Sequence, residues 1–397
     1  MRHSLKGIFG AALSAALAAG CSTVQVSPSG NQPAEAPQDA SVRNAHWQFD
    51  ASNRPPAESD GYRPPLKLAV LLPLTGSLAA PAASVRDGLL AGYYGEHRRR
   101  PEIRFYDTAD TAAGATTAYA RAVADGADQV LGPLARDGVD AVFRGTQPGV
   151  PVLALNRGSV AAPVNSASFS LAPEDDGSSA ADYVASSKAT RVLVLSSGDD
   201  YARRSVAAFG TQLATHGGSV VQTLAVVSDK PADMTSLLRA AATREGGVDA
   251  VFIALRGNQA RALSPQLASA GLAGKPRVAT SQLLSGTGKA DQDRALDGIA
   301  FPTERWGLVS VGGLPNAAEI GKSLPTARGP AAKLFAFGYD AWLLTGYLEH
   351  LALSADGNVQ GATGVLRIGP AGNVLRTPVW STFSNGYVVP LGTGSGG

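Results

Sequence analysis

The stretch LKLAVLLP at residues 66–73 decides the fold class of this chain. It is apolar at every position except Lys67 until Pro73 ends it. A strand buried on both faces of a parallel sheet has this near-continuous apolar character, whereas a half-exposed strand alternates. A helical pattern follows over residues 80–94. The stretch therefore predicts a buried parallel strand that opens a β-α unit.

The β-α pattern recurs in two series. The first places strands at 103–106, 129–131, 152–155 and 168–171, with helices at 111–124 and 138–143. The second places strands at 191–195, 219–227, 250–254, 277–279 and 298–301, with helices at 201–215, 234–243 and 258–270. Strands that alternate with helices imply parallel sheets covered on both faces. We predict an α/β fold of two lobes, each a doubly wound parallel sheet, with a cleft at the carboxyl ends of the strands.

The carboxyl-terminal part departs from this rhythm. A long aromatic-rich helix is expected over residues 331–353, and short strands over 364–368 and 379–383. We assign residues to the lobes as follows: 66–172 and 300–352 to the first, 173–299 and 353–390 to the second, and 391–397 to a flexible tail.

The amino terminus has the pattern of an export signal. Residues 1–6 are short and basic, and residues 7–19 are apolar or small, a stretch too short to span a bilayer. The segment ends Leu17-Ala18-Ala19-Gly20-Cys21, which resembles the lipobox of bacterial lipoproteins. In that family the cysteine is fatty-acylated, for example with palmitate, and becomes the first residue. Ordinary cleavage after Ala18 is the alternative.

Cys21 is the single cysteine of the chain, and this favours lipidation over a structural role in a disulfide. Ser22 follows it, and the aspartate that often retains lipoproteins at the inner membrane is absent. We therefore expect a signal peptide over residues 1–20 and an anchor on the periplasmic side of the outer membrane. Several acyl chains on one cysteine make such anchoring stable.

Residues 21–65 have the composition of a disordered tether. They are rich in Pro, Ser, Ala, Asn and Gln and show no apolar period, so they bury too little surface to fold. Trp47, Phe49 and Tyr62 are the aromatic residues of this segment. Docking of these side chains on the globular body and a fully solvated linker are both compatible with the sequence.

Composition and spacing exclude several function classes. Without the first twenty residues the chain carries 32 basic and 32 acidic residues, so no general field attracts nucleic acid. The basic run at residues 97–100 is interpreted as a solvated helix end. The five histidines are scattered without metal-ligand spacing, and we find no phosphate loop or nucleophile elbow. The acid pairs at 175–176 and 199–200 are interpreted as helix caps. We expect no enzyme activity, no cofactor and no metal.

Short motifs spread in order over residues 66–390 resemble type I periplasmic-binding proteins of the leucine/isoleucine/valine-binding kind. They are LAVLLPLTG at 68–76, VRDGL at 85–89, GPL at 132–134, DYA at 200–202 and GYDAW at 338–342. In that family the loop after the first strand lines the cleft. The resemblance therefore implies that Leu74, Thr75 and Gly76 face it.

Within this fold the chain is similar to the penicillin-binding-protein activators of the LpoA kind. The similarity rests on LLPL at 71–74, GPL at 132–134 with Arg136, PVLALN at 151–156, and TGVL at 363–366 with Gly372 and Arg376. Such proteins are outer-membrane lipoproteins that stimulate a bifunctional peptidoglycan synthase, a class A penicillin-binding protein. Members of the family carry a helical-repeat domain ahead of this module, where this chain has a linker. The resemblance thus covers only the carboxyl-terminal module.

The residues that would hold a solute separate this interpretation from its alternative, a lipid-anchored solute-binding protein of an ABC transporter for amino acids or a related small anion. Amino-acid-binding relatives use hydroxyl groups where this chain has Arg136, Asp137 and, beside Asn156, a leucine. An amino-acid ligand would leave buried polar groups unpaired, at a cost of about 1–3 kcal/mol each. Tyr201 occupies a position where relatives stack an aromatic ring on the ligand. Two roles are open for it: contact with a ligand in the cleft, or packing at a helix start. Two roles are also open for Asp340: an ion pair across the cleft, or a cap of local backbone. An activator is favoured, and a small-molecule ligand stays open.

Overall fold

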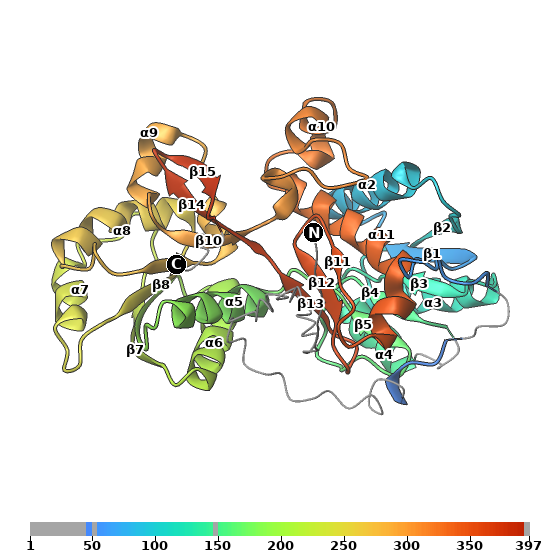
Figure 1. Cartoon of the computed structure of the whole chain (residues 1–397), viewed down its shortest axis with the longest axis horizontal. Helices are drawn as coiled ribbons and strands as arrows, with labels where there is room; N and C mark the ends of the chain where they lie inside the picture. Colours follow the sequence, from blue (N-terminus) through green and yellow to red (C-terminus); the bar gives the residue numbers. More distant parts are fainter. Residues whose placement is uncertain (1–44, 50–53, 146–149, 393–397) are drawn as a thin grey trace, which may run out of the picture. The chain divides into compact units, whose positions relative to one another are not determined.

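The computed structural model describes residues 45–49, 54–145 and 150–392, and Figure 1 shows the course of the chain. The predicted signal peptide, Cys21 and most of the predicted tail lie outside the described residues. Among the helices that are described, none has both the length and the hydropathy needed to cross a membrane.

The apolar run at 66–73 forms the second strand from the edge of a five-stranded parallel sheet. The strand order is β2-β1-β3-β4-β5. These strands are β1 (Lys67–Leu72), β2 (Glu102–Asp107), β3 (Gln129–Leu131), β4 (Val152–Ala154) and β5 (Ser166–Ser168). The α-helices of this first lobe are α2 (Ala79–Gly95), α3 (Ala112–Ala124), α4 (Arg136–Gly145), α10 (Ala317–Ser323) and α11 (Ala331–Leu353).

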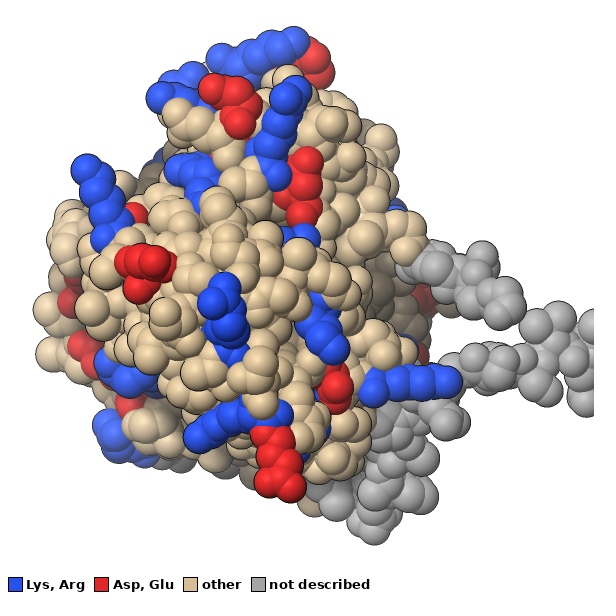
Figure 2. Space-filling view, turned by 90° about the vertical axis from the view of Figure 1, so that its left-hand side faces the viewer, with Lys and Arg blue, Asp and Glu red and all other residues tan. Residues whose placement is uncertain are grey.

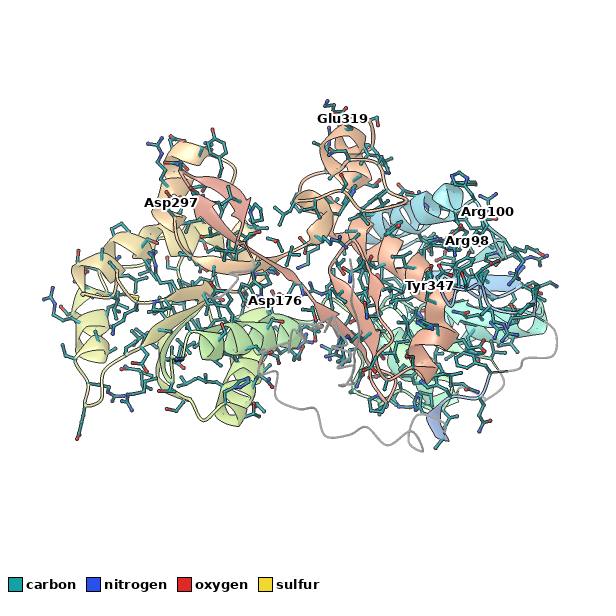
Figure 3. The ribbon with its side chains drawn as sticks, in the orientation of Figure 1. Arg98, Arg100, Asp176, Asp297, Glu319 and Tyr347 are labelled. Atoms are coloured by element: carbon teal, nitrogen blue, oxygen red, sulfur yellow. The ribbon has the colours of Figure 1, made fainter. Side chains whose placement is uncertain are left out.

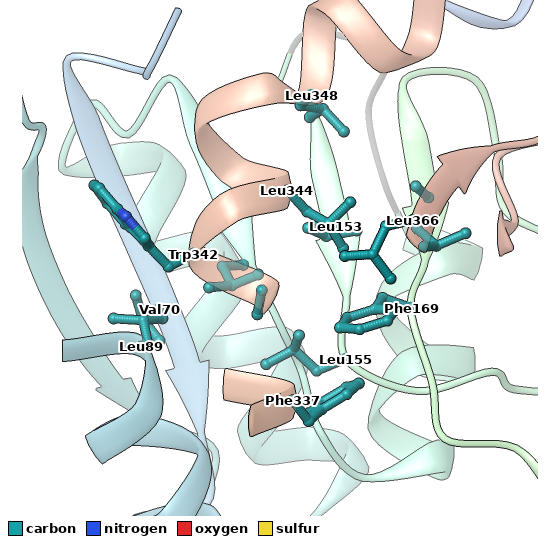
Figure 4. Packing of buried hydrophobic residues seen from close by; sticks show 14 of the residues in the cluster. Val70, Leu89, Leu153, Leu155, Phe169, Phe337, Trp342, Leu344, Leu348 and Leu366 are labelled. Carbon is teal, nitrogen blue, oxygen red and sulfur yellow. The ribbon is translucent and has the colours of Figure 1, made fainter. Parts of the chain in front are cut away.

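Successive residues of β1 enter different cores, as a strand buried on both faces requires. Leu68, Val70 and Leu72 pack into the cluster that contains α2 and α11. Ala69 and Leu71 pack into the opposite cluster, with α3 and α4. Figure 4 shows the first cluster, in which the ring of Phe337 on α11 lies beside that of Phe169. The two rings stack with their centroids 4.3 Å apart.

The second lobe contains a seven-stranded sheet with the order β15-β14-β10-β9-β8-β6-β7. The strands that pair in parallel are β6 (Arg191–Ser196), β7 (Ser219–Ala225), β8 (Ala250–Ala254), β9 (Arg277–Ala279) and β10 (Ala300–Thr303). The antiparallel pair at one edge is β14 (Val379–Ser384) and β15 (Tyr387–Pro390). The helices of the lobe are α5 (Pro173–Ser186), α6 (Asp200–Thr215), α7 (Thr235–Ala242), α8 (Gly257–Ser269) and α9 (Ala290–Asp293). The predicted two-lobed α/β fold is confirmed.

Two predicted lobe boundaries differ from the observed ones. β10, expected in the first lobe, pairs with β9 and β14 of the second sheet. Residues 353–377, expected in the second lobe, contain the antiparallel strands β11 (Val359–Gln360), β12 (Val365–Ile368) and β13 (Val374–Thr377). Leu366 and Val374 from these strands pack into the first lobe's core. An apolar run predicts a strand, but long-range backbone pairing decides which sheet receives it.

Part of the segment expected to be a tether packs against the first lobe instead. We call residues 54–65 the strap. Tyr62 of the strap is 3% exposed, and Trp47, which precedes the strap in the chain, is also 3% exposed. Arg54 and Arg63 both form ion pairs with Glu349 of α11, at 2.7 and 2.8 Å. Isolated aromatic residues carry no periodicity, and for this reason composition alone did not predict the docking.

The basic run at 97–100 also has a role other than a solvated helix end. Arg98 pairs with Asp60 of the strap at 2.9 Å and with Glu96 at 2.8 Å. Its guanidinium carbon lies 3.8 Å from the centroid of the Tyr62 ring. Arg98 therefore fastens the strap to the first lobe, and Figure 3 shows it near Tyr347, whose hydroxyl donates to Asp60.

Candidate functional site at the lobe junction

The loop after β1, predicted to face the cleft, is exposed and is shaped by the end of β2. The hydroxyl of Thr75 donates to Asp107 at 2.7 Å, and the backbone N–H of Leu74 donates to the same carboxylate at 2.9 Å. Gly76 has φ +90, and a Cβ there would lie 2.7 Å from the Cβ of Asp110. The turn at this position therefore requires glycine.

The candidates after β3 and β4 are held mainly by local contacts. Arg136 and Asp137 begin α4 and are exposed. The Asp137 carboxylate accepts from the N–H of Gly138 at 2.8 Å. Asn156 donates from its side chain to the carbonyl of Leu134 at 2.9 Å, so it connects the two loops at the carboxyl ends of β3 and β4.

Asp340 is fully buried on α11 and binds backbone of its own lobe. Its carboxylate accepts from the N–H groups of Ala362 and Thr363, the latter at 2.8 Å, and from the Thr363 hydroxyl. Burial raises the pKa of Asp340 to about 7, although these hydrogen bonds act in the opposite direction. Its contacts with 362–363 hold the turn before β12, which corresponds to the local capping alternative considered for this residue.

Tyr201 contacts Asp176, a carboxylate whose role is not evident from the sequence. Its hydroxyl donates to Asp176 at 2.6 Å. The sequence predicts a helix cap at Asp176, but Ala172 occupies the N-cap position of α5, and Asp176 is 1% exposed inside the protein. The carboxylate also accepts from the N–H of Ser281 at 2.8 Å. The capping interpretation is wrong for Asp176 and confirmed for Asp199, which accepts from the N–H of Ala202.

Asp176 belongs to a set of polar side chains that connects the two lobes. Arg376 of β13 lies with a guanidinium nitrogen 3.5 Å from the Asp176 carboxylate, and its side chain is 3% exposed. Lys333 of α11 donates to the hydroxyl of Ser281 at 2.9 Å and lies 3.4 Å from the Glu304 carboxylate. We call these residues the junction network: Asp176, Tyr201, Ser281, Glu304, Lys333 and Arg376. Figure 3 marks Asp176 on α5.

The charge state of Asp176 follows from its surroundings. Burial by itself would raise its pKa, but Lys333, Arg376 and the hydrogen bonds from Ser281 and Tyr201 hold the pKa below its usual value. Burial and the neighbouring carboxylate raise the pKa of Tyr201 well above its ordinary value. At neutral pH, Asp176 is therefore an anion that accepts a hydrogen bond from a neutral phenol.

A second ion pair crosses the junction beside this network. Arg157, in the loop after β4, lies 3.3 Å from Asp175, the neighbour of Asp176 on α5. Burial is the largest influence on Asp175 and raises its pKa. Two adjacent carboxylates of the second lobe are thus paired with two arginines of the first. Over the described ranges 45–49, 54–145 and 150–392, we find no group of three or more His, Cys, Asp or Glu residues suited to a metal ion.

A family comparison covers nearly all of the described chain. The model of the family described as "LppC putative lipoprotein" matches residues 62–386. The chain belongs to the LppC family. This membership, together with the relatives below that carry the LpoA name, confirms the predicted similarity to the LpoA kind of protein.

Relatives and solved structures agree with this assignment. The LppC-family chain is 26% identical over 341 residues to "Penicillin-binding protein activator LpoA" of Mannheimia succiniciproducens, covering 82% of this chain and 55% of the relative. It spans about half the length of the curated relatives that it matches. The solved C-domain of LpoA from Haemophilus influenzae, "a regulator of PBP1A", is 21% identical with a TM-score of 0.70. That match covers 82% of this chain and 99% of the C-domain and shows the fold.

A solute-transport protein has the same fold. A Chromobacterium violaceum structure, described as a "putative branched-chain amino acid ABC transporter", is 28% identical with a TM-score of 0.63. The match covers 80% of this LppC-family chain and all of that chain. Fold alone does not separate an activator from a solute binder, so the residues of the junction must carry that distinction.

Proposed function

We propose that this chain is an outer-membrane lipoprotein, acylated at Cys21, that binds a class A penicillin-binding protein and activates its peptidoglycan synthesis. The names of the curated relatives support activation of a penicillin-binding protein. The match to the LpoA C-domain supports assigning this role to the module described by the structure. The lipobox pattern at residues 17–21 supports the anchor.

The pairing of charged side chains at the lobe junction is the observation that favours an activator over a solute binder. A solute binder must offer donors to the carboxylate of its ligand. Here Arg376 and Lys333 are paired with Asp176 and Glu304. Of these two pairs, Asp176–Arg376 is buried, and removing one partner of a buried ion pair typically costs about 3–5 kcal/mol. A solute that bound Asp176 or Arg376 would therefore have to replace a contact that already exists. The second arginine at the junction, Arg157, is paired with Asp175.

The surface of the second lobe supports a protein partner over a polyanion. Figure 2 shows Lys and Arg side chains interspersed with Asp and Glu on this face. Such a surface has local charges of both signs and no broad positive field. Recognition would then depend on complementary shape and local charge pairs.

Binding to a synthase tests the proposal directly. The full acylated chain in detergent is immobilised, and a purified class A penicillin-binding protein from the same bacterium is applied. We expect saturable binding that a monofunctional transpeptidase does not show. Absence of binding under conditions where the synthase is active would contradict the proposal.

The alternative function is supported by the 28% identical transport-related structure. It predicts that the chain binds a small solute. Calorimetry with leucine, isoleucine and valine distinguishes the two functions. An activator gives no heat of binding at millimolar amino acid, whereas micromolar affinity for one of them would establish the alternative.

A further inference from the structure

In the described region, members of the junction network lie in, or within four residues of, every segment by which the chain passes between the lobes. These segments are residues 169–172 before α5, residues 304–305 after β10, and residues 377–378, which run from the last residue of β13 to the start of β14. Asp176 is in the first turns of α5, Glu304 is in the second crossing, and Arg376 directly precedes the third. A rotation of one lobe against the other must occur at these crossings.

The contacts of the network run from one lobe to the other. Arg376 and Lys333 come from the first lobe, and they bind Asp176, Ser281 and Glu304 on the side of the second. Ser281 links the two halves, because its N–H donates to Asp176 while its hydroxyl accepts from Lys333. Opening the junction would therefore break several bonds together.

Burial makes this network different from the surface ion pairs of the same chain. The side chains of Asp176 and Arg376 are 1% and 3% exposed. The pair Lys322–Glu319, by contrast, has side chains 70% and 68% exposed, and such pairs contribute little. Separating Asp176 from Arg376 without solvating both would leave an unpaired buried charge in each lobe.

We infer that the junction network is a built-in latch that holds the two lobes at one angle without a bound solute. Ion pairs and hydrogen bonds of the chain itself then bridge the lobes. The module then presents a fixed surface composed of both lobes. This inference concerns the conformation of the chain, and it does not depend on the identity of the partner.

Distance measurements between the lobes test the latch. Spin labels are attached at Thr117→Cys on α3 and Thr211→Cys on α6, both exposed positions, in the full chain with Cys21→Ser. Double electron–electron resonance then gives the distribution of interlobe distances. We expect one narrow distribution that millimolar leucine does not change.

The double variant Asp176→Asn/Arg376→Met removes both charges while retaining approximate shape, and it avoids an unpaired buried charge. We expect its distance distribution to become broad or bimodal. The control is Asp293→Asn/Arg261→Met, which removes an ion pair between the buried Asp293 and the partly exposed Arg261, both within the second lobe. The control should keep the narrow distribution.

The latch is refuted if the junction variant keeps the narrow distribution, or if the parent distribution is broad. A shift of the parent chain's distance distribution on adding leucine would also overturn it.

If the junction variant fails to fold, Lys333→Met provides the second test. Lys333 is 29% exposed, so its replacement should destabilise the fold less. Hydrogen exchange at residues 169–172 and at Thr377 should then increase, and unchanged exchange would contradict the latch. Failure of synthase binding with an intact narrow distribution would reject the proposed function alone.

Discussion

Replacing Asp340 by asparagine should remove much of the pH dependence of the stability of the first lobe. Asp340 is fully buried, and its pKa is raised to about 7 because burial disfavours the charged form. A carboxyl group whose pKa is higher in the folded than in the unfolded chain stabilises the fold at low pH. This contribution is lost as pH rises from the unfolded pKa through the folded one.

The size of the effect follows from the shift. The ordinary pKa of the group is 3.8, so the difference to about 7 corresponds to roughly 4 kcal/mol when integrated over the whole interval. Between pH 5 and pH 7 the unfolded state is already ionised, whereas the folded state stays largely protonated until the pH approaches its pKa, so about half of the decline falls in this window. The amide of the Asp340→Asn variant resembles the protonated acid and does not ionise.

Urea unfolding followed by circular dichroism measures this difference. The parent chain should lose about 2–3 kcal/mol of unfolding free energy between pH 5 and pH 7 through this group, since one pKa unit corresponds to about 1.4 kcal/mol. The Asp340→Asn variant should lack that decline. Asp297→Asn, at a partly buried position of the second lobe that accepts from the N–H groups of Asn385 and Gly386, serves as the control. Equal pH dependence in the parent and in Asp340→Asn would refute the reasoning.

Three further predictions concern the core, the strap and the anchor. Phe169→Ala removes a fully buried ring stacked on Phe337 and should lower the unfolding free energy by about 3–5 kcal/mol. A loss below about 1 kcal/mol in urea melts would contradict the packing. Glu349→Gln removes the charge that binds Arg54 and Arg63, at a cost of about 1–3 kcal/mol. Hydrogen exchange should therefore increase over the strap, residues 54–65, but not over α6. Unchanged exchange in the strap would contradict docking of the strap through Glu349. Cys21→Ala should move the protein from the membrane to the soluble fraction, and retention in the membrane would exclude lipidation as the anchor.

Much of the fold was predictable because it is recorded in local patterns. The run at 66–73 predicts a strand buried on both faces, and its alternate residues enter the two cores of the first lobe. The strands at 191–195 and 250–254 behave in the same way in the second lobe. Burial of both faces requires apolar residues at consecutive positions, and this signal is visible without any tertiary information.

The junction network was not predictable, since its members come from separate segments without a shared motif. Asp176 and Arg376 are two hundred positions apart and meet only when the two lobes have formed. The acid pair at 175–176 stands at a helix start, where capping is the usual role of a carboxylate. Arg376 contributes to the family resemblance, but nothing in the neighbouring sequence predicts its contact with Asp176. The assignment of β10 and of strands β11 to β13 failed for the same reason, because strand pairing depends on distant backbone.

Glycan polymerisation by a class A penicillin-binding protein tests the central claim most directly. The synthase is assayed in proteoliposomes with lipid-linked precursor, with and without the full acylated chain. The proposed function predicts an increase in initial rate that saturates with the chain and does not change on adding leucine. An unchanged rate at saturating, demonstrably folded chain would contradict the account.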